Sequence, residues 1–315
     1  MRILLTGGCG YIGSILASKL LDAGFKVTVA DIMWFGNHLS YHRNLKVVQQ
    51  DIRNIGDMEI EDVDAVIHLA NIANDPCGDL NSKLSWEVNA LATMRLAEWA
   101  IQHNAKQFIY ASSGSVYGVK DEPQVTEDLS LLPISDYNKT KMISERVLMS
   151  YEDSMLIQLI RPATVCGFSP RMRLDLSVNM LTMQALANRK ITVFGGNQIR
   201  PNIHIQDIAN VVLFFLEQGE NVKGIYNAGF ENLSIMDIAK KVVEFVPAEI
   251  VVTPSNDPRS YRLNSDKLLA AGFKPKYTVD CAIKEIIDGF KSGDIKDEDG
   301  CYNVRSMKNN QDLLQ

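Results

Sequence analysis

The fold is decided by one stretch near the start of the chain, Arg2-Ile3-Leu4-Leu5-Thr6-Gly7-Gly8-Cys9-Gly10-Tyr11-Ile12-Gly13. Its apolar run Arg2–Thr6 is typical of a buried strand, and Tyr11–Ala23 has the pattern of a helix. Between them, Gly7, Gly10 and Gly13 have the spacing G-x-x-G-x-x-G. Glycines at such a turn let the backbone approach a pyrophosphate, and the first N–H groups of the helix attract its charge. The stretch therefore predicts the first strand and helix of a dinucleotide-binding sheet.

Outward from this turn, the chain repeats the alternation of buried strand and helix. Further strands are expected over Lys26–Ala30, Lys46–Gln49, Ala65–Leu69, Gln107–Ala111 and Met155–Ile160, with helices over Trp86–His103 and Asp136–Tyr151. This alternation predicts an α/β fold with a doubly wound parallel sheet of modified Rossmann type. After Arg161-Pro162 the pattern changes to a smaller C-terminal α/β unit. Its expected elements are helices over Ser177–Ala187, Gln206–Glu217, Ile235–Phe245 and Val279–Lys291 and a strand over Ile191–Phe194.

These segments suggest two domains and a tail. Residues 1–165, with part of 195–230, are expected to form the nucleotide-binding domain. Residues 166–195 and 230–291 are expected to form the substrate domain. Residues 292–315 are polar and without a clear apolar face, so we expect a loosely packed tail.

Composition excludes several classes of protein. The 315 residues include 32 Lys and Arg against 38 Asp and Glu, a net charge of −6, which argues against nucleic-acid and anionic-membrane partners. No apolar run approaches the roughly 18 residues of a membrane span, and the apolar start is too short for a signal peptide. The five cysteines are odd in number and widely spaced, which favours reduced thiols in the cytoplasm. No metal-ligand spacing occurs, and no metal is expected.

An acidic residue at the end of the second strand indicates which dinucleotide binds. Asp31 follows Gly13 by eighteen residues, where a carboxylate can accept both ribose hydroxyls and repel a 2′-phosphate, so NAD is favoured over NADP. The alternative is an ordinary turn with a solvent-facing Asp. Asp51 and Ile52 are candidates for the adenine contact, with a helix cap as the equal alternative for Asp51. The remaining cofactor candidates are Tyr11 and Ile12 in the turn, Leu69 and Ala70 at a strand end, and Asn89, whose role can also be structural.

A second motif carries acid–base chemistry. Tyr137 and Lys141 form Y-x-x-x-K, which on a helix places both side chains on one face. A nearby ammonium favours the phenolate and lowers the tyrosine pKa, so the pair can act as a tuned acid–base. In isolation this spacing also fits a solvated helix face. The run Ser112-Ser113-Gly114-Ser115-Val116-Tyr117-Gly118 follows the fifth strand and supplies a hydroxyl for the same substrate oxygen.

These motifs, in this order, resemble the extended short-chain dehydrogenase/reductase superfamily and its nucleotide-sugar epimerase/dehydratase branch. The resemblance covers roughly residues 1–290. It implies a bound NAD, a nucleotide-diphosphate sugar as substrate, and an enzyme that oxidises a ring hydroxyl, most often at C4. It also implies Ser113, Tyr137 and Lys141 as catalytic residues, with Tyr137, Lys141 and Pro162 also contacting NAD.

The resemblance assigns substrate contacts in the second half of the chain. Thr164 occupies the place of the family's usual Asn, and Asn179 matches a residue near the diphosphate. Val193 and Phe194 match a strand beside the nucleobase. Arg200 and Arg259 resemble two arginines that clamp the diphosphate by bidentate contacts, the alternative for each being a pair with a surface carboxylate.

The resemblance leaves the outcome of the reaction open. A 4-epimerase returns hydride to the other face of the sugar, whereas a 4-dehydrogenase releases the keto sugar. A 4,6-dehydratase is disfavoured, because Ser113-Gly114-Ser115 stands where dehydratases carry Thr-Asp-Glu, and Gly114 leaves room for a turning sugar. A non-catalytic NAD-binding sensor or scaffold, and an NADP enzyme of lipophilic ketones, are further alternatives. We expect a homodimer formed by Trp86–His103 and Asp136–Tyr151, and a role in surface-polysaccharide synthesis with GDP- or dTDP-linked sugars.

Overall fold

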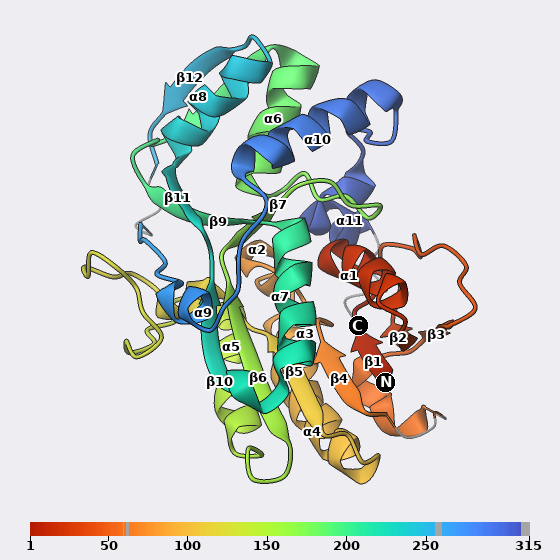
Figure 1. Ribbon diagram of the computed structural model, residues 1–315. Coiled ribbons are helices and arrows are strands. Elements are labelled where there is room, and N and C mark those ends of the chain that lie inside the picture. Colours follow the sequence, from red (N-terminus) through yellow and green to blue (C-terminus); the bar gives the residue numbers. More distant parts are fainter. Residues whose placement is uncertain (59, 61–62, 256–259, 310–315) are drawn as a thin grey trace.

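A seven-stranded parallel sheet forms the centre of the computed structural model, which describes residues 1–58, 60, 63–255 and 260–309 (Figure 1). The strand order is β10-β6-β5-β4-β1-β2-β3, and every neighbouring pair is parallel. The strands are β1 (Arg2–Thr6), β2 (Lys26–Asp31), β3 (Leu45–Gln49), β4 (Ala65–His68), β5 (Gln107–Ala111), β6 (Leu156–Pro162) and β10 (Gly224–Ala228). This order confirms the predicted doubly wound sheet. It places the direction change between β1 and β4, where such sheets bind ligands at the carboxyl ends of the strands.

Both faces of the sheet are covered because alternate side chains of each strand point to opposite sides. In β1, Ile3 and Leu5 join one buried cluster, whereas Leu4 joins another. Helices α1 (Tyr11–Asp22) and α7 (Ile205–Gln218) lie side by side over the first face. Helices α4 (Ala92–Gln102) and α5 (Asp136–Met149) cover the second face. The sheet is therefore buried on both sides, which explains the nearly continuous apolar strands.

The expected helix 86–103 is divided in the structure. It consists of α3 (Ser82–Trp86), a π-helical turn η2 (Glu87–Leu91) and α4. Asn89 lies inside the π-helical turn, with its side chain buried and bonded to the segment after β4. A π-turn inserts an extra residue and redirects side chains, which periodicity in the sequence does not reveal.

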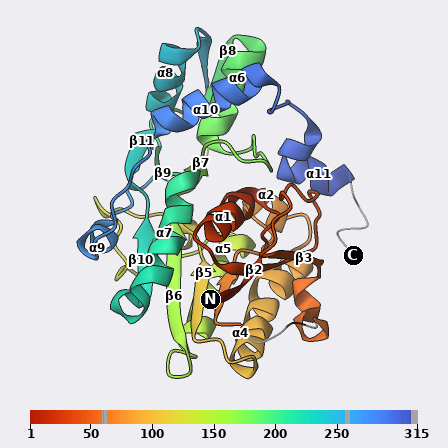
Figure 2. The same cartoon turned by 45° about the vertical axis from the view of Figure 1, so that its right-hand side comes forward.

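The later part of the chain builds a second unit above the sheet (Figure 2). Its apolar core lies between α6 (Ser177–Asn188), α8 (Ile235–Phe245), α10 (Val279–Ser292) and the parallel pair β8 (Lys190–Phe194) and β12 (Glu249–Thr253). A three-stranded sheet of β7 (Thr164–Cys166), β9 (Ile199–His204) and β11 (Glu231–Ser234) lies below this core. Short elements complete the fold: η1 (Ile52–Asp57), α2 (Asp75–Gly78), η3 (Gly114–Tyr117), η4 (Gly219–Val222), α9 (Asp266–Ala270), η5 (Asp299–Cys301) and α11 (Asn303–Asn309).

The two-part organisation matches the expected smaller C-terminal unit. Helix α7 and strand β10, from the 195–230 segment, return to the large sheet. The residue boundaries of the domains stay a prediction. Strands β7, β9, β10, β11 and β12 were not expected from the sequence, because they are short and lack a clear alternation of apolar and polar residues.

The C-terminal segment differs from the loosely packed tail that we expected. Ile295 and Met307 are each only 2% exposed, and α11 contacts α2 beside the large sheet. The backbone N–H of Leu174 donates to the carbonyl of Cys301 at 2.8 Å. Three widely separated side chains, Ile295, Cys301 and Met307, anchor this segment, and so sparse a pattern has no helical or strand period to detect.

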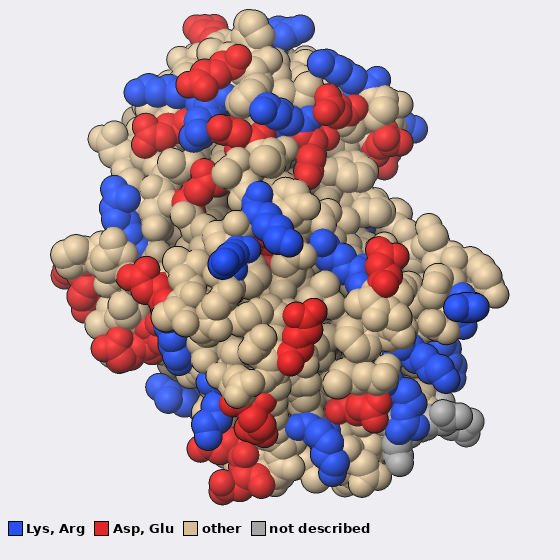
Figure 3. Space-filling view, in the orientation of Figure 1, with Lys and Arg blue, Asp and Glu red and all other residues tan. Residues whose placement is uncertain are grey.

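The surface carries charges of both signs. On the face shown in Figure 3, Lys and Arg side chains are interspersed with Asp and Glu. Within the described ranges, no helix is both long and apolar enough to cross a membrane.

Candidate active site

The glycine turn is shaped by close approaches that exclude a side chain. A Cβ on Gly13 would lie 2.2 Å from the carbonyl oxygen of Gly7, and one on Gly7 would lie 2.5 Å from the backbone nitrogen of Ala70. Gly7 also has a φ of +73°, a conformation that glycine adopts without strain. Helix α1 can therefore begin directly against β1, with its N-cap residue Gly10 making no side-chain capping bond. Such a turn presents free N–H groups to a phosphate.

Asp31 ends β2 at the edge of the same turn. Its carboxylate accepts hydrogen bonds from the backbone N–H groups of Met33, at 2.7 Å, and Cys9, at 2.9 Å. Burial raises the pKa of Asp31, while these two bonds and the nearby Arg171 guanidinium lower it. The carboxylate is thus fixed in place and faces the cavity beside the glycine turn.

Asp51 has the helix-capping role and also lines the cavity, whereas its contact with adenine stays a prediction. It caps the short helix η1, accepts from the backbone N–H of Arg53 at 2.8 Å and pairs with the Arg53 guanidinium at 2.7 Å. Its neighbour Ile52 is 6% exposed, and both residues line the cavity. The hydrogen bonds with Asp51 raise the pKa of the Arg53 guanidinium.

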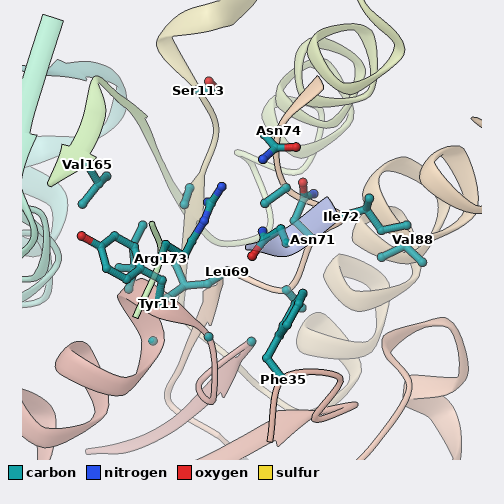
Figure 4. Close-up of a pocket in the computed structure, with 18 of the residues that line it drawn as sticks. Tyr11, Phe35, Leu69, Asn71, Ile72, Asn74, Val88, Ser113, Val165 and Arg173 are labelled. Carbon is teal, nitrogen blue, oxygen red and sulfur yellow. The ribbon is translucent and has the colours of Figure 1, made fainter. Parts of the chain in front are cut away.

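One cavity of about 380 Å³ joins the two sequence motifs. It extends from the glycine turn and Asp31 to the Y-x-x-x-K pair on α5. Figure 4 shows Leu69 and Tyr11 on one side of it and Ser113 and Asn74 on another. Of the residues expected to bind cofactor or substrate, the following line it: Gly7, Gly10, Tyr11, Ile12, Gly13, Asp31, Asp51, Ile52, Leu69, Ala70, Ser113, Tyr137, Lys141, Pro162 and Thr164.

The residues present fit NAD. The glycine turn is a cradle that a single Cβ would fill, and a fixed carboxylate stands beside it. Two buried guanidinium nitrogens on the cavity wall, Nε of Arg171 and Nη2 of Arg173, have no hydrogen-bond partner among the described residues. A buried unpaired donor is costly, so these atoms fit the oxygens of an anionic ligand.

The catalytic candidates meet at the far end of this cavity. Ser113 follows β5, and Tyr137 lies on the first turn of α5, which is capped by the Ser135 side chain. The Ser113 hydroxyl hydrogen-bonds with that of Ser115 at 2.7 Å, and Ser115 in turn donates to the side-chain oxygen of Asn138. Desolvation raises the pKa of Tyr137 to about 12, although its hydrogen bond with Ser113 lowers it in part.

Lys141 is buried one helical turn after Tyr137. Its ammonium donates to the carbonyl of Ala111 at 2.6 Å and lies 6.0 Å from the ring centre of Tyr137. Burial lowers the pKa of Lys141 to about 7, and the Glu145 carboxylate, one turn further along α5, opposes this shift. A phenolate on Tyr137 would favour the charged ammonium, and the ammonium would favour the phenolate. The geometry therefore couples the two protons.

This burial predicts a pH-dependent gain of stability when Lys141 is replaced. The unfolded lysine keeps a pKa of 10.5, whereas the folded one has a pKa of about 7. Between these values only the unfolded chain holds the proton, so the cost of burying Lys141 grows as pH falls from 10.5 to about 7. We expect Lys141→Met to raise the free energy of unfolding of the ligand-free protein by a few kcal/mol at pH 7, at roughly 1.4 kcal/mol per pKa unit.

Urea unfolding at pH 7 and pH 10 measures this effect. The gain should shrink strongly at pH 10. Lys139→Met is the matched control, because the Lys139 side chain is 45% exposed on the same helix and pairs with Asp136 at 3.2 Å. Equal gains for Lys141→Met at both pH values would contradict the lowered pKa.

Several residues expected at the site lie elsewhere. Asn89 is fully buried and bonds to Ile72 at 2.8 Å and to Thr140 at 3.2 Å, so it joins the segment after β4 to α5 rather than lining the cavity. Asn179 is also buried, and its amide bonds to Tyr11 at 3.0 Å and to the backbone of Gly167. Both side chains hydrogen-bond to residues that line the cavity, Asn89 to Ile72 and Asn179 to Tyr11.

The remaining substrate candidates belong to the second unit. Val193 is fully buried in its core, whereas Phe194 is 54% exposed. Arg200, on β9, donates to the backbone of Ile199 at 3.2 Å and does not line the cavity. Arg259 lies outside the described residues. The structure therefore brings the cofactor and catalytic residues together, and the diphosphate contacts stay predictions.

Two arginines of the site were missed in the sequence. Arg171 and Arg173 lie in the segment between β7 and α6 and line the cavity; Arg171 is buried, and the Arg173 side chain is 11% exposed. Arg173 lies between Tyr11 and Asn71 in Figure 4, and its charge lowers the pKa of Tyr137. The spacing of the two arginines by one residue was the available signal.

The chain matches one protein family over most of its length. The family model described as "NAD dependent epimerase/dehydratase family" matches residues 3–229. The chain belongs to this family. The family assignment confirms the resemblance seen in the motifs, the NAD cofactor and the expectation of an enzyme.

Named relatives and solved structures resemble the chain over most of its length. The UDP-glucose 4-epimerase of Lactobacillus helveticus is 26% identical over 306 residues, covering 88% of this chain and 93% of the relative. The UDP-glucose 4-epimerase of Thermus thermophilus in complex with NAD has a TM-score of 0.81 and 25% identity, covering 92% of this chain and 99% of that one. The UDP-glucuronic acid 4-epimerase of Bacillus cereus in complex with UDP-glucuronic acid and NAD has a TM-score of 0.80 and 26% identity, covering 93% and 99%.

Gly114 is less open than its lack of a side chain suggested. A Cβ at this position would lie 3.2 Å from the carbonyl oxygen of Pro162 and 3.3 Å from the hydroxyl of Tyr261. The position is therefore crowded by neighbours, and the expected room for a turning sugar is not found at Gly114. The position still lacks the acidic side chain that the family's dehydratases carry there.

Proposed function

We propose that this member of the NAD-dependent epimerase/dehydratase family is a 4-epimerase of a UDP-linked hexose. The observation that carries the proposal is the meeting of Ser113, Tyr137 and Lys141 in the same cavity as the glycine turn and Asp31. The relatives support the nucleotide and the outcome, since UDP-glucose and UDP-glucuronic acid 4-epimerases cover nearly the whole chain.

The chain's own residues supply binding and proton transfer. Tyr137 takes the proton of the sugar 4-hydroxyl, and Ser113 hydrogen-bonds the same oxygen. The Lys141 ammonium stabilises the phenolate of Tyr137. Bound NAD supplies a reversible hydride acceptor. The buried position of Lys141, 3% exposed, keeps water from weakening its attraction for the phenolate.

A second candidate substrate follows from the arginines. Arg173 carries a buried guanidinium nitrogen, Nη2, without a partner among the described residues, while its Nε pairs with Asp175 at 2.9 Å. An additional anionic group on the substrate would pair with it. UDP-glucuronic acid, the ligand of the Bacillus cereus enzyme, carries such a group. Thr164, Arg200 and Arg259 stay proposed contacts of the substrate.

The reaction is tested by incubating purified protein and NAD with UDP-glucose, UDP-glucuronic acid, and GDP- and dTDP-linked hexoses. Product sugar nucleotides are analysed by chromatography with mass spectrometry, and NADH absorbance is followed in parallel. The proposal expects a new isomer of unchanged mass from a UDP-sugar and no accumulation of NADH. Loss of two hydrogens with NADH accumulating would instead show a dehydrogenase, and loss of water a dehydratase. Turnover of only GDP- or dTDP-sugars would overturn the nucleotide assignment, and none at all would favour a sensor or scaffold.

A homodimer is part of the proposal. Trp86, Leu91 and Ile143, on α3, η2 and α5, are large apolar side chains that are 37%, 39% and 36% exposed. These helices contact one another and offer a shared apolar face.

We expect Leu91→Glu to convert the dimer to a monomer, measured by sedimentation velocity at micromolar concentration. Placing a charge in an apolar interface leaves it desolvated and unpaired, which is strongly unfavourable. Val119→Glu is the control, because Val119 is a similarly exposed apolar residue, at 41%, outside these helices. A wild-type protein that sediments as a monomer would refute the interface.

A cytoplasmic location and a role in surface-polysaccharide synthesis are also proposed. All five cysteines are free, and four of them are buried. Unpaired thiols are typical of a reducing compartment.

A further inference from the structure

The C-terminal segment forms part of the cofactor cavity. Asn303 and Met307, one turn apart on α11, line the same cavity as the glycine turn and Asp31. Asn303 is 4% exposed and Met307 is 2% exposed. Met307 belongs to the apolar cluster against which Trp34 and Phe35, from the segment between β2 and β3, also pack, and both of these residues line the cavity. A segment distant in sequence therefore faces the cofactor site.

A continuous chain of contacts passes through α11. The Arg171 guanidinium stacks on the ring of Phe35 at 3.9 Å and donates to the side-chain oxygen of Asn303 at 2.5 Å. The backbone N–H of Asn303 donates to the Asp175 carboxylate at 3.2 Å, and the Asn74 amide donates to the same carboxylate at 3.4 Å. We call these five residues, Phe35, Arg171, Asn303, Asp175 and Asn74, the belt.

The belt joins the two sides of the glycine turn. Phe35 follows β2, and Asn74 follows β4, which are the two strands that flank β1 in the sheet. Because the carboxyl ends of parallel strands lie at one edge, the glycine turn after β1 lies between these two points. Apart from Asp175, every belt residue lines the cavity. A ligand seated on the glycine turn is therefore bordered by the belt from one side of the turn to the other.

We propose that the belt closes the NAD site, so that α11 controls entry and release of the cofactor. NAD passes only when the Arg171–Asn303 and Asn303–Asp175 contacts separate. The side-chain hydrogen bond of Asn303 with Arg171 and its backbone hydrogen bond with Asp175 must break together, which slows both the entry and the release of NAD. A protein that keeps its NAD through many turnovers suits a reaction in which the cofactor is regenerated in place. Closure by the belt requires only that the protein binds NAD, whatever reaction it catalyses.

Exchange of labelled NAD tests the belt without any sugar substrate. Full-length protein is loaded with isotopically labelled NAD and chased with unlabelled NAD, and bound label is counted over time. Entry is followed separately by stopped-flow quenching of tryptophan fluorescence, because Trp34 lines the cavity. The variants are Asn303→Ala and a chain ending at Tyr302, which lacks α11. Lys308→Ala is the matched control, because Lys308 is an exposed residue next to Met307.

The belt predicts that release and entry both accelerate at least ten-fold in the two variants and stay within two-fold of wild type in Lys308→Ala. If NAD release accelerates in the variants but NAD entry does not, α11 only contacts the bound cofactor, and closure by the belt is overturned. Rates within two-fold of wild type in Asn303→Ala would overturn it as well, and this variant decides alone if the shortened chain fails to fold. If the protein is an active epimerase and its variants exchange NAD at the wild-type rate, the closure by the belt is overturned and the proposed function stands. If the protein shows no turnover but exchanges NAD slowly, and Asn303→Ala speeds that exchange, the belt is kept and the proposed function is lost.

Discussion

Replacing Tyr137 by phenylalanine is expected to lower kcat by about 10²–10⁴-fold, the usual contribution of a positioned acid–base group. The substitution removes only the hydroxyl that hydrogen-bonds with Ser113, while the ring and its place on α5 remain. NAD binding, measured by calorimetry, should stay close to wild type because the glycine turn and Asp31 are untouched. The loss should appear on any substrate that the enzyme accepts.

The pH dependence of the activity is a second test of the role of Tyr137. Because desolvation raises the pKa of Tyr137 to about 12 in the ligand-free protein, only a small fraction is phenolate at neutral pH, and kcat/KM, which reports the free enzyme, should rise with pH. Ser113→Ala removes the hydrogen bond that lowers this pKa, so its profile should shift to higher pH. Tyr151→Phe, in the turn just after the other end of α5, is the control and should leave kcat/KM unchanged. A Tyr137→Phe enzyme with more than a tenth of wild-type kcat would disprove the assignment of the base.

The largest loss of stability is expected from Glu145→Ala, at about 3–5 kcal/mol of unfolding free energy. Glu145 and Arg161 are 1% and 2% exposed and form a bidentate pair, with distances of 2.9 and 2.7 Å. Removing the carboxylate leaves a buried guanidinium charge without its partner and frees Ser112, which donates to Glu145 at 2.5 Å. Urea unfolding at pH 7 measures the loss.

Two comparison variants separate the buried charge from other causes. Asp280→Ala breaks the Lys241 pair, whose side chains are 29% and 39% exposed, and should cost under about 1 kcal/mol. Glu145→Leu combined with Arg161→Met removes both charges and should be less destabilised than Glu145→Ala alone. If the double variant loses more stability than the single one, an uncompensated charge is not the cause.

The same pair connects stability to the active site. Glu145 raises the pKa of Lys141, which burial lowers. Glu145→Ala should therefore leave Lys141 less protonated at neutral pH. Without that ammonium the Tyr137 phenolate loses its stabilising neighbour. The buried pair thus supports the fold and the acid–base residues together.

The local pattern of the sequence determined most of the parallel sheet and the position of the cofactor turn. β5 was expected at Gln107–Ala111 and is found there, because a buried strand between two helices is apolar on both faces. The glycine turn was equally readable, since only glycine fits where a Cβ would lie 2.2 Å from a backbone oxygen. Motif spacing also placed Tyr137 and Lys141 on one helix face.

Only the tertiary structure decided which distant side chains complete the site. Arg171 and Arg173 lie in an irregular segment, and Asn303 and Met307 lie in a segment expected to be a loose tail. Their place depends on contacts such as Arg171 with Phe35 and Asn303 with Asp175, which join residues more than one hundred positions apart. Periodicity reports how one element meets the core, and it carries no information about which loops meet across a cavity. The sequence therefore determined the sheet and its chemistry, whereas the folded chain decided what surrounds the cofactor.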